Sequence, residues 1–144
     1  MYSRIDLSKT NYDLMPNAER LEPVPVRAVL DIYKDYCLYK KFTSCMPIFP
    51  NELTRSNTDI IGYFADEKLV AFSMIDIMDS DNVENMQFAW NYEQPKLRLG
   101  IESMKHECAY YKELGYKYLY MGGDEYYKGE IDGFELSWGI SWLV

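Results

Sequence analysis

The densest group of residues that could carry chemistry is the run YLYMGGDEYYK, residues 118–128. A carboxylate at Asp124 or Glu125 could take a proton from an attacking amine, and the phenol of Tyr127 could return one to a leaving group. Lys128 could bind a carboxylate or a phosphate. Each residue taken singly fits an exposed turn with packed tyrosines at least as well. The cluster as a whole is denser than a plain turn requires, which makes it a candidate site.

A predicted strand and its broken end must position this cluster. The run Tyr116–Met121 is rich in residues that favour strands. Successive strand residues alternate between faces, so Tyr118 and Tyr120 share one side. Gly122 and Gly123 then predict a bulge or a splayed strand end. The two tyrosines are therefore expected to face the same space as the polar residues that follow.

An amphipathic helix is predicted before this strand. Its apolar residues recur in steps of four and three, which places them on one helical face. They are Leu97, Ile101, Met104, Cys108 and Tyr111. Gly115 follows at the point where a left-handed residue commonly ends a helix.

The start of this helix, Lys96–Ile101, is a second candidate site. Backbone N–H groups at a helix N-terminus bind anions, and Gly100 would let a ligand approach the backbone closely. Lys96 and Arg98 could add positive charge, while Leu99 and Ile101 flank the glycine. The alternative is that Gly100 relieves crowding between helix and sheet and that the two basic residues are simply solvated.

The rest of the chain predicts a single α+β domain over residues 1–144. Helices are expected at 26–42 and just after Pro50, and residues 1–25 are expected to form an extended arm with one short strand at most. Antiparallel strands are expected at 59–64, 69–77 and 83–90, and a closing strand or hairpin at 131–144. Mostly antiparallel strands with separate helices are typical of an α+β fold in which the long helix packs on one sheet face.

Composition excludes several classes of protein. The hydrophobic content of 48% supports a packed core. The net charge of −8 argues against a broad nucleic-acid-binding face, since such affinity rests on Lys and Arg. No apolar run approaches the roughly 18–20 residues of a membrane span.

The three cysteines and one histidine argue against a metal site. Cys37, Cys45 and Cys108 form no CxxC pair, and His106 is expected to be a solvated helix residue. An odd cysteine count without a secretory signal favours a reduced cytoplasmic protein. A single histidine off the apolar face also provides no Ser–His–Asp arrangement, which argues against hydrolase chemistry.

Four stretches resemble one known family. They are LVAFSMIDIMD (69–79), MQFAWNYEQPKLRLGIESMKHE (86–107), ELGYKYLYMGG (113–123) and YYKGEIDGFEL (126–136). In order and spacing they resemble the C-terminal catalytic domain of the arginyl-tRNA–protein transferases and their bacterial leucyl and aspartate relatives. That domain has the fold of the GNAT acyltransferases, a mixed and mostly antiparallel sheet flanked by helices.

The resemblance implies a transfer reaction between two candidate sites. It implies an acyl or aminoacyl group that moves from a CoA thioester, such as acetyl-CoA, or from an aminoacyl-tRNA to an amine of a small molecule or protein. The donor would bind at residues 96–101 and the acceptor at Tyr118, Tyr120, Asp124 and Lys128. Glu125 and Tyr127 would be the catalytic acid–base residues. Direct attack by an amine needs no metal, and tRNA as donor would be the one nucleic-acid partner.

An alternative is a non-catalytic binding or assembly module that has lost the donor site. The glycine signature Q/R-x-x-G-x-G/A of acetyl-CoA enzymes is reduced here to Gly100 after Arg98. Asp76 is expected either to anchor the loop after its strand or to line the cleft. Trp138 and Trp142 would cap the sheet or bury in a homodimer contact.

Overall fold

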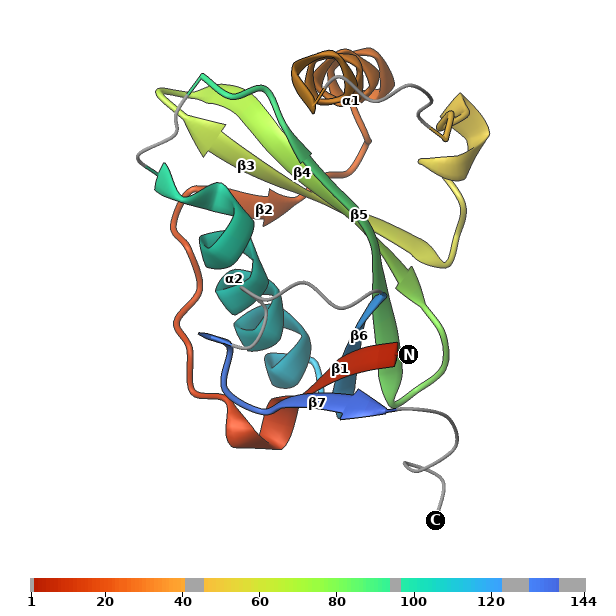
Figure 1. The fold of residues 1–144 in the computed structure, drawn as a ribbon. Coiled ribbons are helices and arrows are strands. Elements are labelled where there is room, and N and C mark those ends of the chain that lie inside the picture. Colours follow the sequence, from red (N-terminus) through yellow and green to blue (C-terminus); the bar gives the residue numbers. More distant parts are fainter. Residues whose placement is uncertain (1, 41–45, 94–96, 123–129, 138–144) are drawn as a thin grey trace.

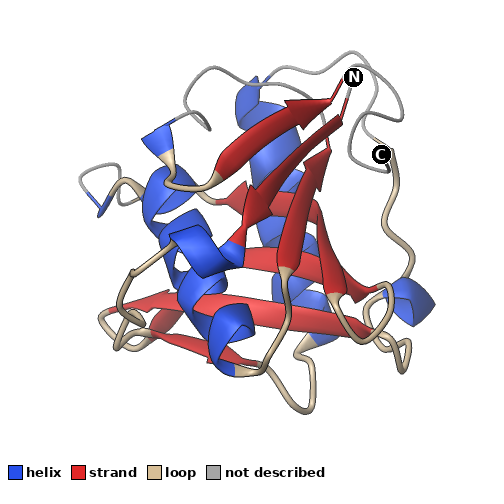
Figure 2. Ribbon diagram, turned by 90° about the horizontal axis from the view of Figure 1, so that it is seen from below, coloured by secondary structure: helices blue, strands red, loops and turns tan. Residues whose placement is uncertain are grey.

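The computed structural model describes residues 2–40, 46–93, 97–122 and 130–137. Over these ranges the chain forms one seven-stranded sheet with helices on both faces (Figures 1 and 2). The helices are α1 (Val26–Lys40) and α2 (Leu99–Glu113), with short 3-10 turns η1 (Leu7–Lys9) and η2 (Pro50–Glu52). The strands are β1 (Tyr2–Asp6), β2 (Ala18–Arg20), β3 (Thr58–Ala65), β4 (Lys68–Ile77), β5 (Asn82–Trp90), β6 (Tyr118–Gly122) and β7 (Phe134–Ser137).

The sheet is mixed and mostly antiparallel, as the sequence predicts. Its strand order is β2-β3-β4-β5-β6-β1-β7. The three central strands β3, β4 and β5 form an antiparallel meander. Helix α2 then connects β5 to β6, and these two strands pair in parallel. A parallel pair needs a crossover connection, which is what the helix provides.

The N-terminal residues belong to the sheet rather than to an arm that lies across the body. Strand β1 pairs with β6 on one side and with β7 on the other. Strand β2 pairs with β3 at the far edge of the sheet. Figure 1 shows β1, in red, between β6 and β7. The expectation of at most one short strand in residues 1–25 is wrong, because both strands pair with segments far away in the chain and such pairing leaves no local signal.

Two hydrophobic clusters fill the two faces of the sheet. Strand residues alternate between faces, so Ile61 and Tyr63 of β3 join the cluster beneath α2, whereas Ile60 joins the cluster beneath α1. The α1 cluster includes Val29 and Ile32 of that helix. In Figure 1 the two helices lie on opposite sides of the central strands.

Helix α2 buries four of the five residues of the predicted apolar face: Ile101, Met104, Cys108 and Tyr111. The prediction is wrong for Leu97, which is exposed and precedes the helix, because α2 begins only at Leu99. The helix ends at Gly115, whose φ of 97° is left-handed, and the following N–H of Tyr116 donates back to the Tyr111 carbonyl. This is the glycine-terminated helix end that the sequence predicts.

The cysteines differ from one another. Cys108 is a free, buried thiol, whereas Cys37 is disulfide-bonded. The expectation of a fully reduced chain is therefore wrong for Cys37. Cys45 lies outside the described residues.

Candidate functional site

The start of α2 is an open stretch of backbone. The helix begins at Leu99, after Arg98 in a left-handed conformation (φ 50°), and no side chain caps it. Ile101 and Glu102 donate their N–H groups to the Arg98 carbonyl. Within the described ranges, the N–H groups of Leu99 and Gly100 have no hydrogen-bond acceptor. These are the donors that a helix N-terminus offers to an anion or a carbonyl oxygen.

Gly100 borders open space. A methyl group built on its Cα would have no heavy atom of the described residues within 4 Å. In the described part of the chain, the alternative that this glycine relieves crowding between helix and sheet is therefore wrong. The side chains of Leu99 and Ile101 are buried in the core, so these residues can present only backbone to a ligand. Arg98 is exposed, and Lys96 lies outside the described residues.

Strands β5 and β6 run side by side only at their first residues. Asn82–Glu84 pair with Tyr118–Tyr120, and β5 then continues to Trp90 without a recorded partner among the residues described in β6. A register shift against β4 leaves Met86 as an extra residue in β5 just past this point. Such a bulge bends a strand and increases its twist. The two parallel strands thus part beyond Glu84, on the side where α2 begins.

The two predicted acceptor residues of β6 are held by an arginine from β1. The guanidinium of Arg4 lies 3.9 Å from the centroid of the Tyr118 ring. It also donates to the hydroxyl of Tyr120 at 3.3 Å and forms an ion pair with Glu135 at 3.5 Å. Sequence reasoning missed Arg4 because residues 1–25 were interpreted as an arm.

Two carboxyl groups face each other across β4 and β5. Asp76 is the register partner of Glu84 and accepts a hydrogen bond from the hydroxyl of Thr58 at 2.9 Å. Burial raises the pKa of Glu84, and the charge of Asp76 raises it further. Asp76 therefore anchors to the neighbouring strand β3 and also influences Glu84, which the sequence reasoning did not single out.

These groups form a polar row across the sheet. Its members are successive register partners on neighbouring strands: Thr58, Asp76, Glu84, Tyr120, Arg4 and Glu135. The row passes through the point where β5 and β6 part. The predicted residues Asp124, Glu125, Tyr127 and Lys128 lie outside the described residues, so their relation to the row stays a prediction.

A buried carboxylate lies on the other face of the sheet. Glu107 of α2 is fully buried. It accepts hydrogen bonds from the hydroxyl of Tyr63 at 2.6 Å, the hydroxyl of Ser73 at 2.7 Å and the amide of Asn85 at 2.6 Å. Burial raises the pKa of Glu107, and the three hydrogen bonds act against this rise. No role is assigned to Glu107 from the sequence, because its partners lie on three separate strands.

His106 is buried, which corrects the expectation of a solvated residue. Its side chain is 3% exposed, and its Nδ1 accepts the backbone N–H of Met15 at 2.9 Å. The rings of Tyr63 and Tyr110 lie 5.8 and 6.0 Å from the imidazole, centroid to centroid. Burial lowers the pKa of His106. The segment that covers this side of α2 comes from the N-terminal residues, which explains the error.

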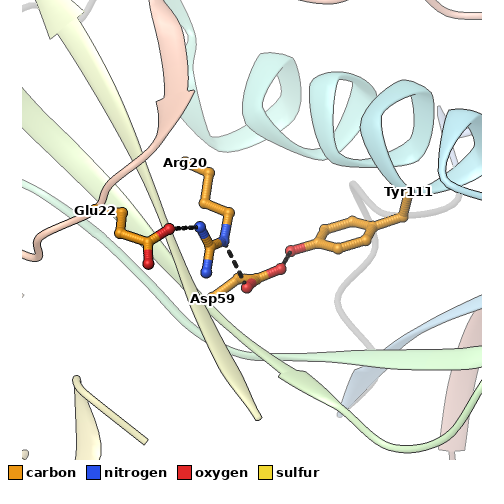
Figure 3. A network of polar contacts seen from close by, with 4 residues as sticks. All are labelled: Arg20, Glu22, Asp59 and Tyr111. Carbon is orange, nitrogen blue, oxygen red and sulfur yellow. Dashed lines mark hydrogen bonds and ion pairs between the residues drawn. The ribbon is translucent and has the colours of Figure 1, made fainter. Parts of the chain in front are cut away.

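A third polar contact joins α2 to the edge of the sheet (Figure 3). Tyr111 donates its hydroxyl to Asp59 at 2.8 Å, and Arg20 donates its Nε to the other oxygen of Asp59 at 2.9 Å. Arg20 also pairs with Glu22. This network connects α2 with β3 and β2, well away from β6 in the strand order.

The described residues contain no group of three or more His, Cys, Asp or Glu side chains placed to hold a metal ion. Among the helices in these ranges, none is long and apolar enough to cross a membrane.

Comparison with known families decides which proteins the chain is related to. Residues 28–129 match the family model described as "Arginine-tRNA-protein transferase, C terminus". The chain belongs to this family. The match covers α1, the central strands, α2 and β6. It confirms the resemblance that the four sequence stretches indicate. No significant match was found among curated protein sequences.

Solved structures show the fold of this family member. The C-terminal domain of a putative lysylphosphatidylglycerol synthetase from Agrobacterium fabrum matches 84% of the chain with a TM-score of 0.64 and 12% identity. The ribosomal-protein-S18-alanine N-acetyltransferase from Escherichia coli matches 72% of it with a TM-score of 0.59 and 14% identity. A GCN5-related N-acetyltransferase from Kribbella flavida matches 93% of it with a TM-score of 0.59 and 13% identity.

These likenesses confirm the predicted GNAT-like fold. At such low identity they show the fold alone. The matches cover 45%, 64% and 52%, respectively, of the three solved chains. Activity, substrates and partners of the whole proteins therefore enter only as proposals for this chain.

Proposed function

We propose that this protein is an acyl or aminoacyl transferase that moves its group from a CoA thioester or an aminoacyl-tRNA to an amine. The observation that carries the proposal is that β5 continues beyond Glu84 without a recorded pairing to the described residues of β6, and that the helix after it, α2, has an uncapped start. Family membership supports a transfer reaction. The proposal gives a role to the start of α2 and to the residues at the end of the pairing.

The start of α2 is the proposed donor site. The N–H groups of Leu99 and Gly100, which have no acceptor among the described residues, would bind a phosphate or the carbonyl oxygen of the donor, where negative charge develops during attack. The open space over Gly100 supports this role, since a ligand could reach the backbone there. Arg98 and Lys96 would add positive charge for a phosphate.

The polar row is part of the proposed acceptor site. The amine nitrogen attacks the carbonyl carbon, an N–C bond forms, and the C–S bond of a thioester or the C–O bond of an ester breaks. The amine loses a proton and the leaving thiolate or alkoxide gains one. Glu84 is a candidate base because its raised pKa brings it closer to that of an effective base near neutral pH. Glu125 remains the base predicted from the sequence, with Tyr127 as the acid.

The remaining residues of the proposed acceptor site would orient the amine. Tyr118 and Tyr120 are held in place by Arg4, so their rings are preorganised. Asp124 and Lys128 keep the acceptor-binding roles predicted from the sequence. Preorganised groups lose less entropy when a ligand binds.

The alternative function is a binding or assembly module that keeps the fold and no longer uses a donor. The feature that favours it is the left-handed Arg98 immediately before the helix, where the glycine-rich signature is reduced to Gly100. The net charge of −8 also opposes a large polyanionic donor such as tRNA.

A titration followed by a transfer assay separates these functions. The full chain is titrated by calorimetry with acetyl-CoA and with arginyl- and leucyl-tRNA, and then incubated with a panel of amines and peptides under mass spectrometry. Transfer of the acyl or aminoacyl group supports the proposal. Donor binding without transfer to any amine contradicts the transfer reaction, and the absence of any donor binding rejects the transferase and favours the module.

A further inference from the structure

Glu107 connects α2 to three strands at once. One carboxylate oxygen, Oε2, accepts from Tyr63 of β3 and Ser73 of β4. The other, Oε1, accepts from Asn85 of β5 at 2.6 Å. None of the ion pairs among the described residues includes Glu107. A buried carboxylate without a cationic partner is costly, and apolar side chains could hold a helix to a sheet without that cost.

The partner of Oε1 lies at the point where β5 leaves β6. Glu84 is the last residue of β5 that pairs with β6, so Asn85 is the first residue beyond the pairing. Met86, the extra residue of the bulge, follows directly. A strand that has lost one neighbour has fewer backbone bonds to fix its path, and a side-chain hydrogen bond at that residue restrains it.

The other end of the connection is the helix that opens the proposed donor site. Glu107 follows Gly100 by about two turns, or about 10 Å along the helix axis. The intervening residues Ile101 and Met104 are buried against the sheet, so this half of α2 moves as one piece. A change in the Glu107 contact therefore reaches the start of the helix.

We infer that Glu107 is a positioning residue that fixes the path of β5, where it leaves β6, relative to helix α2, through its hydrogen bond with Asn85. The inference rests on the proposed function, because that function assigns the start of α2 to the donor. Glu107 itself is buried and touches no substrate. The hydrogen bonds with Tyr63 and Ser73 hold the carboxylate in place, and the bond with Asn85 transmits its position to β5.

Asn85→Leu is the test variant and Ser73→Ala is its matched control. Each removes one hydrogen bond to the same buried carboxylate and leaves two others. Ser73 lies on the inner strand β4, which does not pair with β6, whereas Asn85 lies on β5 directly after its last pairing with β6. If the cluster only stabilises the fold, both variants behave alike. Asn85→Ala, which adds no bulk, replaces Asn85→Leu if that variant does not fold.

The measurements are calorimetric affinity for coenzyme A and aminoacyl-tRNA, unfolding midpoints, and backbone amide NMR signals of Leu99, Gly100 and Tyr120, which are distant in sequence from both substitutions. We expect similar losses of unfolding midpoint in both variants, at least tenfold weaker donor binding in the Asn85 variant alone, and shifted amide signals in that variant alone. Equal weakening in both variants, or unchanged amide signals in the Asn85 variant, overturns the inference. If the wild type binds no donor, the proposed function fails and the amide signals alone decide whether Glu107 positions β5.

Discussion

Replacement of Gly100 by alanine tests whether the start of α2 is a ligand site. Gly100 is the second residue of the helix, and an added methyl group would have no heavy atom within 4 Å among the residues that the structure describes. Positive φ values occur at Gly115 and Gly133, and Gly100 does not have one. Alanine can therefore adopt this backbone conformation without strain or collision.

The expected change in stability follows from the backbone. Gly→Ala at a compatible helical position stabilises a protein by about 0.4–1 kcal/mol, chiefly because the unfolded chain has fewer conformations to lose. For a chain of this size, 1 kcal/mol corresponds to a rise in melting temperature of about 2–4 °C. Chemical denaturation and thermal melting of the wild type and Gly100→Ala measure this difference.

The expected change in binding has the opposite sign. The methyl group would occupy the space through which a donor reaches the N–H groups of Leu99 and Gly100. Loss of one hydrogen bond to a charged ligand group costs about 1.5–3 kcal/mol, which is about a 10- to 150-fold weaker affinity for coenzyme A or aminoacyl-tRNA. Calorimetry on the same samples measures it. A destabilised variant would contradict the packing argument, and a stabilised variant with unchanged donor affinity would refute the assignment of the donor to this helix start.

Three further substitutions test other parts of the structure. Gly133→Ala should destabilise the fold by more than about 1 kcal/mol in urea denaturation. The reason is that φ of Gly133 is 79° and that the added Cβ would lie 2.5 Å from the backbone carbonyl oxygen of Asp6. An unchanged unfolding free energy would be inconsistent with this geometry. Burial lowers the pKa of His106, so the native residue binds fewer protons than the unfolded residue. The contribution of His106 to stability is therefore full above pH 6.5 and is lost as the pH falls through the folded pKa. His106→Asn, which retains an acceptor for the Met15 N–H, should flatten the decline of the unfolding free energy between pH 7 and 5, and an unchanged slope would argue against a buried neutral imidazole. Asp76→Asn should lower the pKa of Glu84 in an NMR titration and leave it above the usual glutamate value, since burial is the larger cause; an unchanged pKa would show that the two carboxyl groups do not interact.

The elements of the fold could be predicted from the sequence because their signals are local. The helix predicted at 26–42 spans Val26–Lys40, and the strand predicted at 69–77 spans Lys68–Ile77. The helix end at Gly115 depends on a preference of that residue for a left-handed backbone. Hydrophobic periodicity and turn residues act over a few positions, so they are visible without tertiary contacts.

The partners of the polar residues required the tertiary structure. His106 contacts Met15, which is 91 positions away, and Arg4 contacts Tyr120 across 116 positions. No local pattern records which segment will cover a helix or enter a sheet. The predicted donor residues are close together because they are neighbours in the chain, whereas the polar row is assembled from separate strands.

By itself the sequence determined the two long helices, most of the strands, the family and the helix start near Gly100, whereas the open space at Gly100 came from the structure. The tertiary structure decided that β1 enters the sheet between β6 and β7, that Arg4 joins Tyr118 and Tyr120, and that Glu107 is buried among three strands. The physical reason is that α2 is covered on one side by the sheet and on another by N-terminal residues. The buried surface of α2 is therefore wider than its apolar face, and the polar residues His106 and Glu107 beside that face are buried as well.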